Sequence, residues 1–338
     1  MIDKNFVILL FFVYVLSLFG TIYYRKFALR HNILANLNFR TLHEKPTPRG
    51  GGIVFSMVFV FFVFFLYFIN LVELELMLVF GIGAGLATTV GYIDDLKGIG
   101  TIKKLILQFL LVLLILYVFN GGPLSMIERL SGWVSWTISA FLLLWLINVY
   151  NFIDGIDGLA ISGAILILIT LLLTFYITNH TSNLVPLFLV LFASSLGFLF
   201  FNWPKASIFM GDSGSIFLGY CFGAFIIYSL MKNEISFLTW LVVFGYYLVD
   251  TTITTLIRIM LVKKWYHPHR SHAYQNLARK LDNHAIVSFG VMVYHILWLL
   301  PLAIWTVLKP NFGIIAVVLA FLPSIIWSIK FGPLFSRE

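Results

Sequence analysis

Long apolar runs separated by short polar segments make up almost the whole sequence. A transmembrane helix needs about 20 predominantly apolar residues. Eleven runs approach or exceed that length, at residues 6–24, 51–70, 76–93, 105–119, 133–150, 159–178, 184–201, 213–231, 236–262, 285–307 and 312–331. The run 236–262 contains Asp250 and Arg258, so we expect this span to be bent, tilted or broken. The pattern predicts an all-α polytopic membrane protein with about 11 transmembrane helices, with 10 as the alternative count.

Composition supports this prediction. The chain has 338 residues, of which 61% are hydrophobic and 11% are charged, whereas soluble proteins are about 25% charged. We expect a single integral-membrane domain over residues 1–338. The one cysteine, Cys221, lies inside an apolar run and offers neither a disulfide framework nor a thiolate metal site. The first run is followed by Arg25 and Lys26 instead of a small-residue cleavage site, so we interpret it as a retained helix.

The distribution of basic residues predicts the orientation. With the N-terminus outside and the C-terminus cytoplasmic, 18 of the 22 Lys and Arg residues lie on the inner side. The four others are Lys4, Arg129, Lys232 and Lys309. The positive-inside rule favours this orientation. The net charge of +8 is then explained by basic inner loops, and nucleic acid is not an expected partner.

In this orientation, every glycine-punctuated polar motif lies on the cytoplasmic face. Accidental polar loops would divide between the two sides, so the pattern predicts one site assembled from several loops. We expect the site to use the inner segments 25–50, 94–104, 148–158, 202–215 and 258–284. Ionisable groups at bilayer depth cost roughly 2.5–3.5 kcal/mol each on insertion scales, which makes them functional candidates.

The segment Asn148–Leu159 is the most informative of these. It places two amides and two carboxylates at a membrane boundary, namely Asn148, Asn151, Asp154 and Asp157. Such oxygen donors suit a hard cation, for which Mg²⁺ is the first choice and Mn²⁺ the alternative. A polar turn without a ligand is the competing interpretation, because Asn, Asp and Gly favour turns.

Further carboxylates end or begin neighbouring runs. Asp94 and Asp95 could bind Mg²⁺ jointly, or one could act as a base while the other binds or orients. Lys104 could neutralise a phosphate or anchor its helix at the membrane surface. Asp212 follows Phe209 and opens the eighth run, where backbone N–H groups attract anions.

The last long inner loop combines His and Arg side chains. Arg270 and His272 suggest contact with a diphosphate, whereas zinc binding and contact with anionic lipid headgroups are the competing interpretations. Asp250 has no evident partner and stays unassigned. Lys45 could cover one side of the site or simply flank a membrane helix.

Taken together, these motifs resemble the polyprenyl-phosphate N-acetylhexosamine-1-phosphate transferases, the superfamily that includes the bacterial phospho-MurNAc-pentapeptide translocase. The matching pieces are Pro46-Thr47-Pro48-Arg49-Gly50-Gly51, Asp94-Asp95, Asn148-x-x-Asn151-x-x-Asp154-Gly-x-Asp157-Gly-Leu159, and Asn202 through Phe209-Met210-Gly211-Asp212-Ser213-Gly214-Ser215. The segment His267–Gln275 most resembles the branch that initiates O-antigen and related surface polysaccharides. It departs from the histidine run of many relatives, because it reads His272-Ala273-Tyr274-Gln275.

The resemblance implies Mg²⁺-dependent transfer of a sugar 1-phosphate from a UDP-N-acetylhexosamine to undecaprenyl phosphate, releasing UMP. It places the enzyme in the bacterial cytoplasmic (inner) membrane with its active site facing the cytoplasm. The catalytic residues that it implies are Asp94, Asp95, Asp212 and His272. The substrate-binding residues are Lys45, Lys104, Asn148, Asp154, Asp157, Phe209 and Arg270. The metal ligands are Asn151 and Asp212.

Several alternatives stay open. The sugar could be N-acetylglucosamine or a 6-deoxy sugar such as N-acetylfucosamine or N-acetylquinovosamine, and the product could initiate another envelope glycan. A transporter of a lipid-linked or anionic solute is the rival of a different class. Gly211-Asp212-Ser213-Gly214 also resembles an intramembrane serine protease, for which His295 is the one deeply placed histidine. Membrane lipids are expected partners, and a homodimer stays open.

Overall fold

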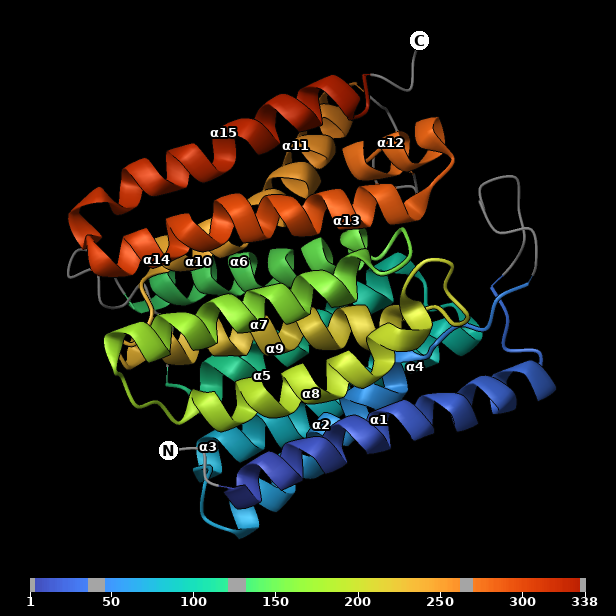
Figure 1. Cartoon of the computed structure of the whole chain (residues 1–338), viewed down its shortest axis with the longest axis horizontal. Coiled ribbons are helices and arrows are strands. Elements are labelled where there is room, and N and C mark those ends of the chain that lie inside the picture. Colours follow the sequence, from blue (N-terminus) through green and yellow to red (C-terminus); the bar gives the residue numbers. More distant parts are fainter. Residues whose placement is uncertain (1–3, 36–45, 121–131, 262–269, 335–338) are drawn as a thin grey trace. The chain divides into compact units, whose positions relative to one another are not determined.

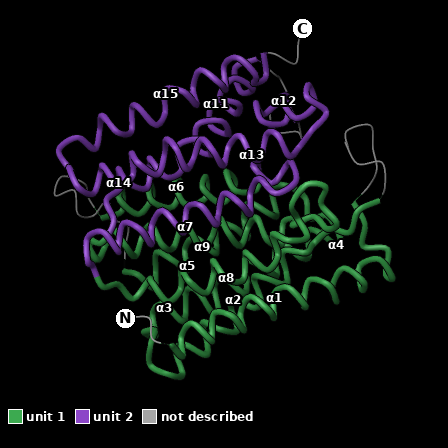
Figure 2. The backbone as a smooth tube through the Cα atoms, in the orientation of Figure 1, with its two compact units in different colours: residues 1–151, 181–234 green, residues 152–180, 235–338 purple. Residues whose placement is uncertain are grey.

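The computed structural model describes residues 4–35, 46–120, 132–261 and 270–334, and Figure 1 traces them. Within these ranges the ordered elements are helices, and no strand occurs. The chain forms two compact units, one of residues 1–151 and 181–234 and one of residues 152–180 and 235–338 (Figure 2). The prediction of a single domain and that of the orientation stay predictions.

The first unit surrounds a central buried helix, α9 (Asp212–Met231). Its other elements are α1 (Lys4–Arg30), α2 (Gly52–Phe68), α3 (Leu74–Met77), the π-helical turn η1 (Leu78–Gly83), α4 (Ala84–Lys97), α5 (Thr101–Val118), α6 (Gly132–Ile153) and α8 (Leu184–Asn202). Helices α2, α4 and α5 pack against α9, while α1 packs against α8 and α2. Because α9 is buried on all sides, its first turn is held by several neighbouring elements.

The second unit contains the bent span and the C-terminal helices. Its elements are α7 (Leu159–Thr178), α10 (Phe237–Val243), α11 (Gly245–Leu261), α12 (Ala273–Leu281), α13 (His284–Tyr294), the π-helical turn η3 (His295–Leu299), α14 (Leu300–Leu308), the short 3₁₀ turn η4 (Pro310–Phe312) and α15 (Gly313–Phe331). Helix α15 packs against α10, α11, α12 and α14, and α7 packs against α13 and α14.

Each of the eleven predicted apolar runs is helical over most of its described residues. In the described part of the chain, nine continuous helical segments are long and apolar enough to cross a membrane. The pair α10–α11 bends by 77° and gives a tenth span, and the shorter apolar helix α2 covers the run 51–70. The expectation of a bent or broken helix over 236–262 is therefore confirmed.

Small residues allow α4 and α9 to approach closely, as is common between membrane helices. A Cβ atom added to Gly91 of α4 would overlap the backbone carbonyl of Asp212 at the start of α9. Gly85 lies in the same helix, and there the nearest atom to an added Cβ is a Val60 methyl group at 3.8 Å. Gly91 therefore sets the distance between α4 and the first turn of α9.

Gly91→Ala is expected to lower the free energy of unfolding by about 1–3 kcal/mol, because an added methyl group forces the packed backbones apart. Gly85→Ala is the matched control, since it makes the same change in the same helix without a clash. The measurement is the thermal unfolding midpoint of both variants in detergent. Equal midpoints for the two variants would contradict the proposed role of Gly91.

Candidate active site

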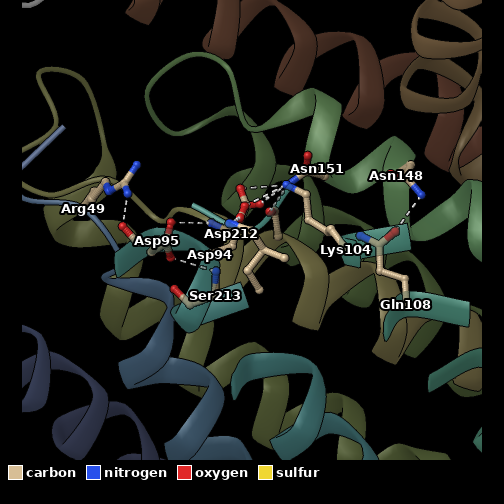
Figure 3. Close-up of polar contacts among 11 residues, drawn as sticks. Arg49, Asp94, Asp95, Lys104, Gln108, Asn148, Asn151, Asp212 and Ser213 are labelled. Carbon is tan, nitrogen blue, oxygen red and sulfur yellow. Dashed lines mark hydrogen bonds and ion pairs between the residues drawn. The ribbon is translucent and has the colours of Figure 1, made fainter. Parts of the chain in front are cut away.

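Four elements of the first unit bring their polar ends together around Lys104 (Figure 3). The Lys104 ammonium at the start of α5 lies 2.8 Å from Asp94 Oδ2 at the end of α4 and 2.6 Å from Asp212 Oδ2 at the start of α9. Asn151 Nδ2, near the end of α6, donates to Asp212 Oδ1 and to Ser215 Oγ, both at 3.0 Å. The structure thus joins four predicted site residues that are far apart in the sequence.

Asp95 has a different environment from its neighbour Asp94. Its carboxylate accepts from the backbone N–H groups of Asp212 and Ser213, each at 3.0 Å. These are the first two residues of α9, where a carboxylate satisfies unpaired N–H groups and complements the helix dipole. Asp95 is buried, with 5% of its surface exposed. Asp95 therefore holds the start of α9, whereas Asp94 faces Lys104.

The segment Pro48–Gly52 fixes the loop that leads into α9. Phe209 N–H donates to the carbonyl of Pro48 at 2.8 Å, and the N–H groups of Gly51 and Gly52 donate back to Phe209 and Met210 at 2.9 and 2.8 Å. A Cβ atom at Gly52 would overlap the backbone of Gly214. This pairing explains why the motif ends in glycines and how the half-buried Phe209 is positioned.

Arg49 of the same segment donates from its guanidinium to the backbone carbonyl of Asp95. The sequence interpretation quoted Arg49 in a motif but gave it no role. The sequence nevertheless pointed to a role for this side chain. Pro48 and Gly50 are typical of a turn, but the arginine between them is not. The predicted residue Lys45 lies outside the described residues.

Asn148 lies one turn before Asn151 on α6. Its Nδ2 donates to Gln108 Oε1 at 3.0 Å and to the carbonyl of Leu144 at 2.8 Å. Gln108 is fully buried and follows Lys104 by one turn of α5. The sequence interpretation missed Gln108, although a lone amide inside the run 105–119, four residues after a basic residue, indicated a polar partner.

The donor set of the first unit fits a magnesium ion. Asp94 and Asp212 provide carboxylate oxygens. Asn151 turns its amide nitrogen toward Asp212, so its amide would have to rotate to present its oxygen to a metal ion. In the described ranges no three His, Cys, Asp or Glu side chains form a group that could hold a metal ion. Mg²⁺ does not require such a group, because it is usually held by one or two carboxylates together with water and substrate phosphates.

Asp157 and His284 lie side by side within the second unit. Asp157 is buried, its Oδ1 lies 3.2 Å from His284 Nδ1 at the start of α13, and its carbonyl accepts from Ser288 Oγ at 2.7 Å. The sequence interpretation missed His284. The sequence feature that could have indicated a role for His284 is its position beside Asn283 at the beginning of an apolar run.

The other predicted residues of the second unit lie in two loops. Asp154 is half-buried in the turn between α6 and α7. Arg270 is exposed, and His272 is buried directly before α12. The aromatic ring of His272 lies 5.8 Å from that of Phe152 and 5.7 Å from that of Tyr274.

The serine-protease alternative finds no support. Ser213 Oγ donates to the carbonyl of Met210 at 3.2 Å, and Ser213 N–H is taken by Asp95. His295 Nε2 lies 3.1 Å from the hydroxyl of Thr170 in the second unit. Each proposed member of the dyad therefore has another partner.

Comparison with known proteins gives one family match and a set of relatives. Residues 76–230 match the model of glycosyl transferase family 4. A probable undecaprenyl-phosphate N-acetylglucosaminyl 1-phosphate transferase of Bacillus subtilis is 28% identical over 260 residues, covering 75% of this chain and 69% of that protein. The matched residues include Asp94, Asp95, Lys104, Asn151 and Asp212.

Two further relatives are more similar over shorter stretches. A phospho-N-acetylmuramoyl-pentapeptide-transferase of Petrotoga mobilis is 33% identical over 204 residues, covering 55% of this chain and 62% of that protein. A decaprenyl-phosphate N-acetylglucosaminephosphotransferase of Mycolicibacterium smegmatis is 31% identical over 232 residues, covering 62% of this chain and 56% of that protein. These matches make the chain similar to the polyprenyl-phosphate N-acetylhexosamine-1-phosphate transferases and support the resemblance that its motifs indicated.

Proposed function

We propose that this protein transfers an N-acetylhexosamine 1-phosphate from a UDP-sugar to undecaprenyl phosphate and releases UMP. The observation that carries the proposal is the cluster of Asp94, Lys104, Asn151 and Asp212, which gathers at the ends of four apolar helices. Phosphoryl transfer depends mainly on positioning and charge neutralisation. A cluster of this kind at the end of membrane spans suits a reaction between a charged nucleotide sugar and a lipid phosphate.

In the proposed reaction, an oxygen of undecaprenyl phosphate attacks the phosphorus that carries the sugar. The bond from this phosphorus to the oxygen bridging to the uridine phosphate breaks, and UMP leaves with that oxygen. Asp94 positions the lipid phosphate and accepts its proton, while the Lys104 ammonium neutralises phosphate charge. Asp212 and Asn151 would hold Mg²⁺, which stabilises negative charge on the transferring phosphate when bound.

Roles for the remaining residues follow the family resemblance. Phe209 of the first unit would stack on the uracil ring. In the second unit, Asp157 would contact the uracil, whereas Arg270 and His272 would contact the diphosphate. Arg270 suits this role because a guanidinium binds phosphate oxygens through paired hydrogen bonds. Asn148 and Asp154 would also bind the substrate, and the Asn148 amide is held by its hydrogen bond to Gln108.

The biological product is the finer part of the proposal. We propose that the reaction initiates O-antigen or a related surface polysaccharide at the cytoplasmic face of the bacterial inner membrane. The support is the amino-acid sequence of the segment His267–Gln275, which resembles that of the branch that initiates O-antigen. An initiating transferase specific for UDP-N-acetylglucosamine is the second candidate, favoured by the name of the Bacillus subtilis relative.

The test is UMP release by the purified protein with undecaprenyl phosphate, Mg²⁺ and a panel of UDP-N-acetylhexosamines. Release that depends on both lipid and metal would support the transferase, and the best donor would identify the sugar. Omitting the lipid is the control for simple hydrolysis of the nucleotide sugar. Absence of UMP with every donor, from folded protein that binds Mg²⁺, would refute the proposal.

A further inference from the structure

Asp250 is a fully buried carboxylate in the bent membrane span. It lies on α11, and its Oδ1 accepts from the backbone N–H of Ala273 at 3.0 Å and from Ser328 Oγ of α15 at 3.3 Å. A carboxylate at membrane depth is costly and is a functional candidate by default. The reaction outlined above makes no use of Asp250, so its partners have to explain its presence.

The first of these partners is the start of α12, which packs against the turn after α6. Tyr274 donates its hydroxyl hydrogen to the carbonyl of Phe152. Burial raises the pKa of the Tyr274 phenol well above its ordinary value, so this side chain stays a neutral donor. A Cβ atom at Gly155 would overlap the side chains of Tyr274 and Gln275. Asp250 therefore anchors the helix that holds the turn containing Asp154.

The second partner is His272, the residue directly before α12. Its Nδ1 lies 4.0 Å from Asp250 Oδ2, which is longer than a hydrogen bond and at the outer limit of an ion pair. Among the described residues, Asp250 Oδ2 accepts no hydrogen bond. The two oxygens of Asp250 thus face different groups, since Oδ1 faces the backbone of α12 and Oδ2 faces the imidazole.

We propose that Asp250 is a positioning residue that anchors α12 through Oδ1 and sets the orientation and tautomer of His272 through Oδ2. The inference rests on the proposed function, in which His272 contacts the diphosphate. A carboxylate beside Nδ1 favours an Nδ1–H tautomer and stabilises the imidazolium ion, and either effect prepares Nε2 for the substrate. Carboxylates that orient a histidine in this way recur at catalytic and metal sites.

The variant Asp250→Asn separates the two proposed roles of Asp250, the orientation of His272 and the anchoring of α12. The Ala273 N–H requires an acceptor, so the Asn oxygen is expected at the Oδ1 position and the amide nitrogen near His272 Nδ1. This nitrogen is a donor, and it would force the proton of His272 onto Nε2. We expect a folded protein whose kcat for UMP release falls by about 10- to 100-fold, with a much smaller change in KM for the UDP-sugar.

Ser328→Ala is the matched control. It removes the other donor to Asp250 Oδ1 without approaching the Oδ2 side, so its kcat should stay within about twofold of wild type. A double-mutant cycle with His272→Gln adds a second test, because Asp250→Asn should cost little once His272 is gone. Equal losses in both backgrounds would show that Asp250 does not act through His272.

The measurement that is independent of activity is the ¹⁵N spectrum of histidine-labelled protein in nanodiscs, with the His272 signals identified by their loss in His272→Gln. Wild type is expected to carry its proton on Nδ1 and Asp250→Asn on Nε2. A wild-type His272 protonated on Nε2 alone would overturn the inference, even if Asp250→Asn did not fold. Failure of the wild type to release UMP would refute the proposed function and leave this spectroscopic result standing.

Discussion

Asp212→Asn is expected to reduce UMP release by about 10²- to 10³-fold, the size of effect seen when one preorganised electrostatic group is removed from an active site. The amide has the same shape, so it can still accept from Asn151 Nδ2, which lies 3.0 Å from Oδ1. It loses the charge that faces Lys104 at 2.6 Å and weakens any metal held there. The loss should appear in kcat, because charge on the transferring phosphate is greatest during the reaction.

Asp282→Asn is the matched control for this experiment. It makes the same chemical change at an exposed position after α12, where the backbone φ of 48° suits Asn as well as Asp. Its turnover should equal that of wild type. The assay follows UMP with saturating lipid and varied Mg²⁺. Turnover of Asp212→Asn within about fivefold of wild type would remove Asp212 from the proposed metal and phosphate site.

The spans could be predicted because bilayer thickness dictates the length of apolar runs. A bend in the span 236–262 was predicted because Asp250 and Arg258 interrupt an otherwise apolar segment, but the observed bend of 77° lies at Phe244, ahead of both charged residues. The partners of Asp250 could not be predicted. They come from α12 and α15, and the contacts between these helices depend on packing that hydropathy does not encode.

The cluster around Lys104 was only partly predictable. Sequence placed Asp94, Asn151 and Asp212 at helix ends and left Lys104 divided between a phosphate ligand and a membrane anchor. The structure places its ammonium between two carboxylates, at 2.6 and 2.8 Å. Gln108 was missed because a single buried amide has no periodic signature, and its partner Asn148 is forty positions away.

The roles of Asp94 and Asp95 were not separable from sequence, since either carboxylate could be the base. In a helix, successive residues point about 100° apart. Asp94 consequently faces Lys104, whereas Asp95 faces the backbone of Asp212 and Ser213. The difference comes from where α9 begins relative to α4, which is a tertiary feature.

Asp94→Asn and Asp95→Asn should therefore fail in different ways. Asp94→Asn removes the proposed base and is expected to lower kcat by about 10²- to 10⁴-fold. Its stability should fall less than that of Asp95→Asn, because its amide oxygen can still accept from the N–H of Ile99 and the partly exposed Lys104 side chain can move away from the new amide nitrogen. Asp95→Asn turns an amide N–H toward one of the two N–H groups at the start of α9. This buried mismatch is expected to cost about 1–3 kcal/mol of unfolding free energy.

The pair of measurements is the thermal unfolding midpoint and the rate of UMP release, taken on both variants in one detergent. A stable, inactive Asp94→Asn beside a destabilised Asp95→Asn would assign Asp94 to the lipid phosphate and Asp95 to the start of α9. The reverse pattern, with Asp94→Asn unstable and Asp95→Asn stable but inactive, would make Asp95 the base. In that case the hydrogen bonds from Asp212 and Ser213 would have to break before the reaction, because both Asp95 oxygens accept from backbone N–H groups.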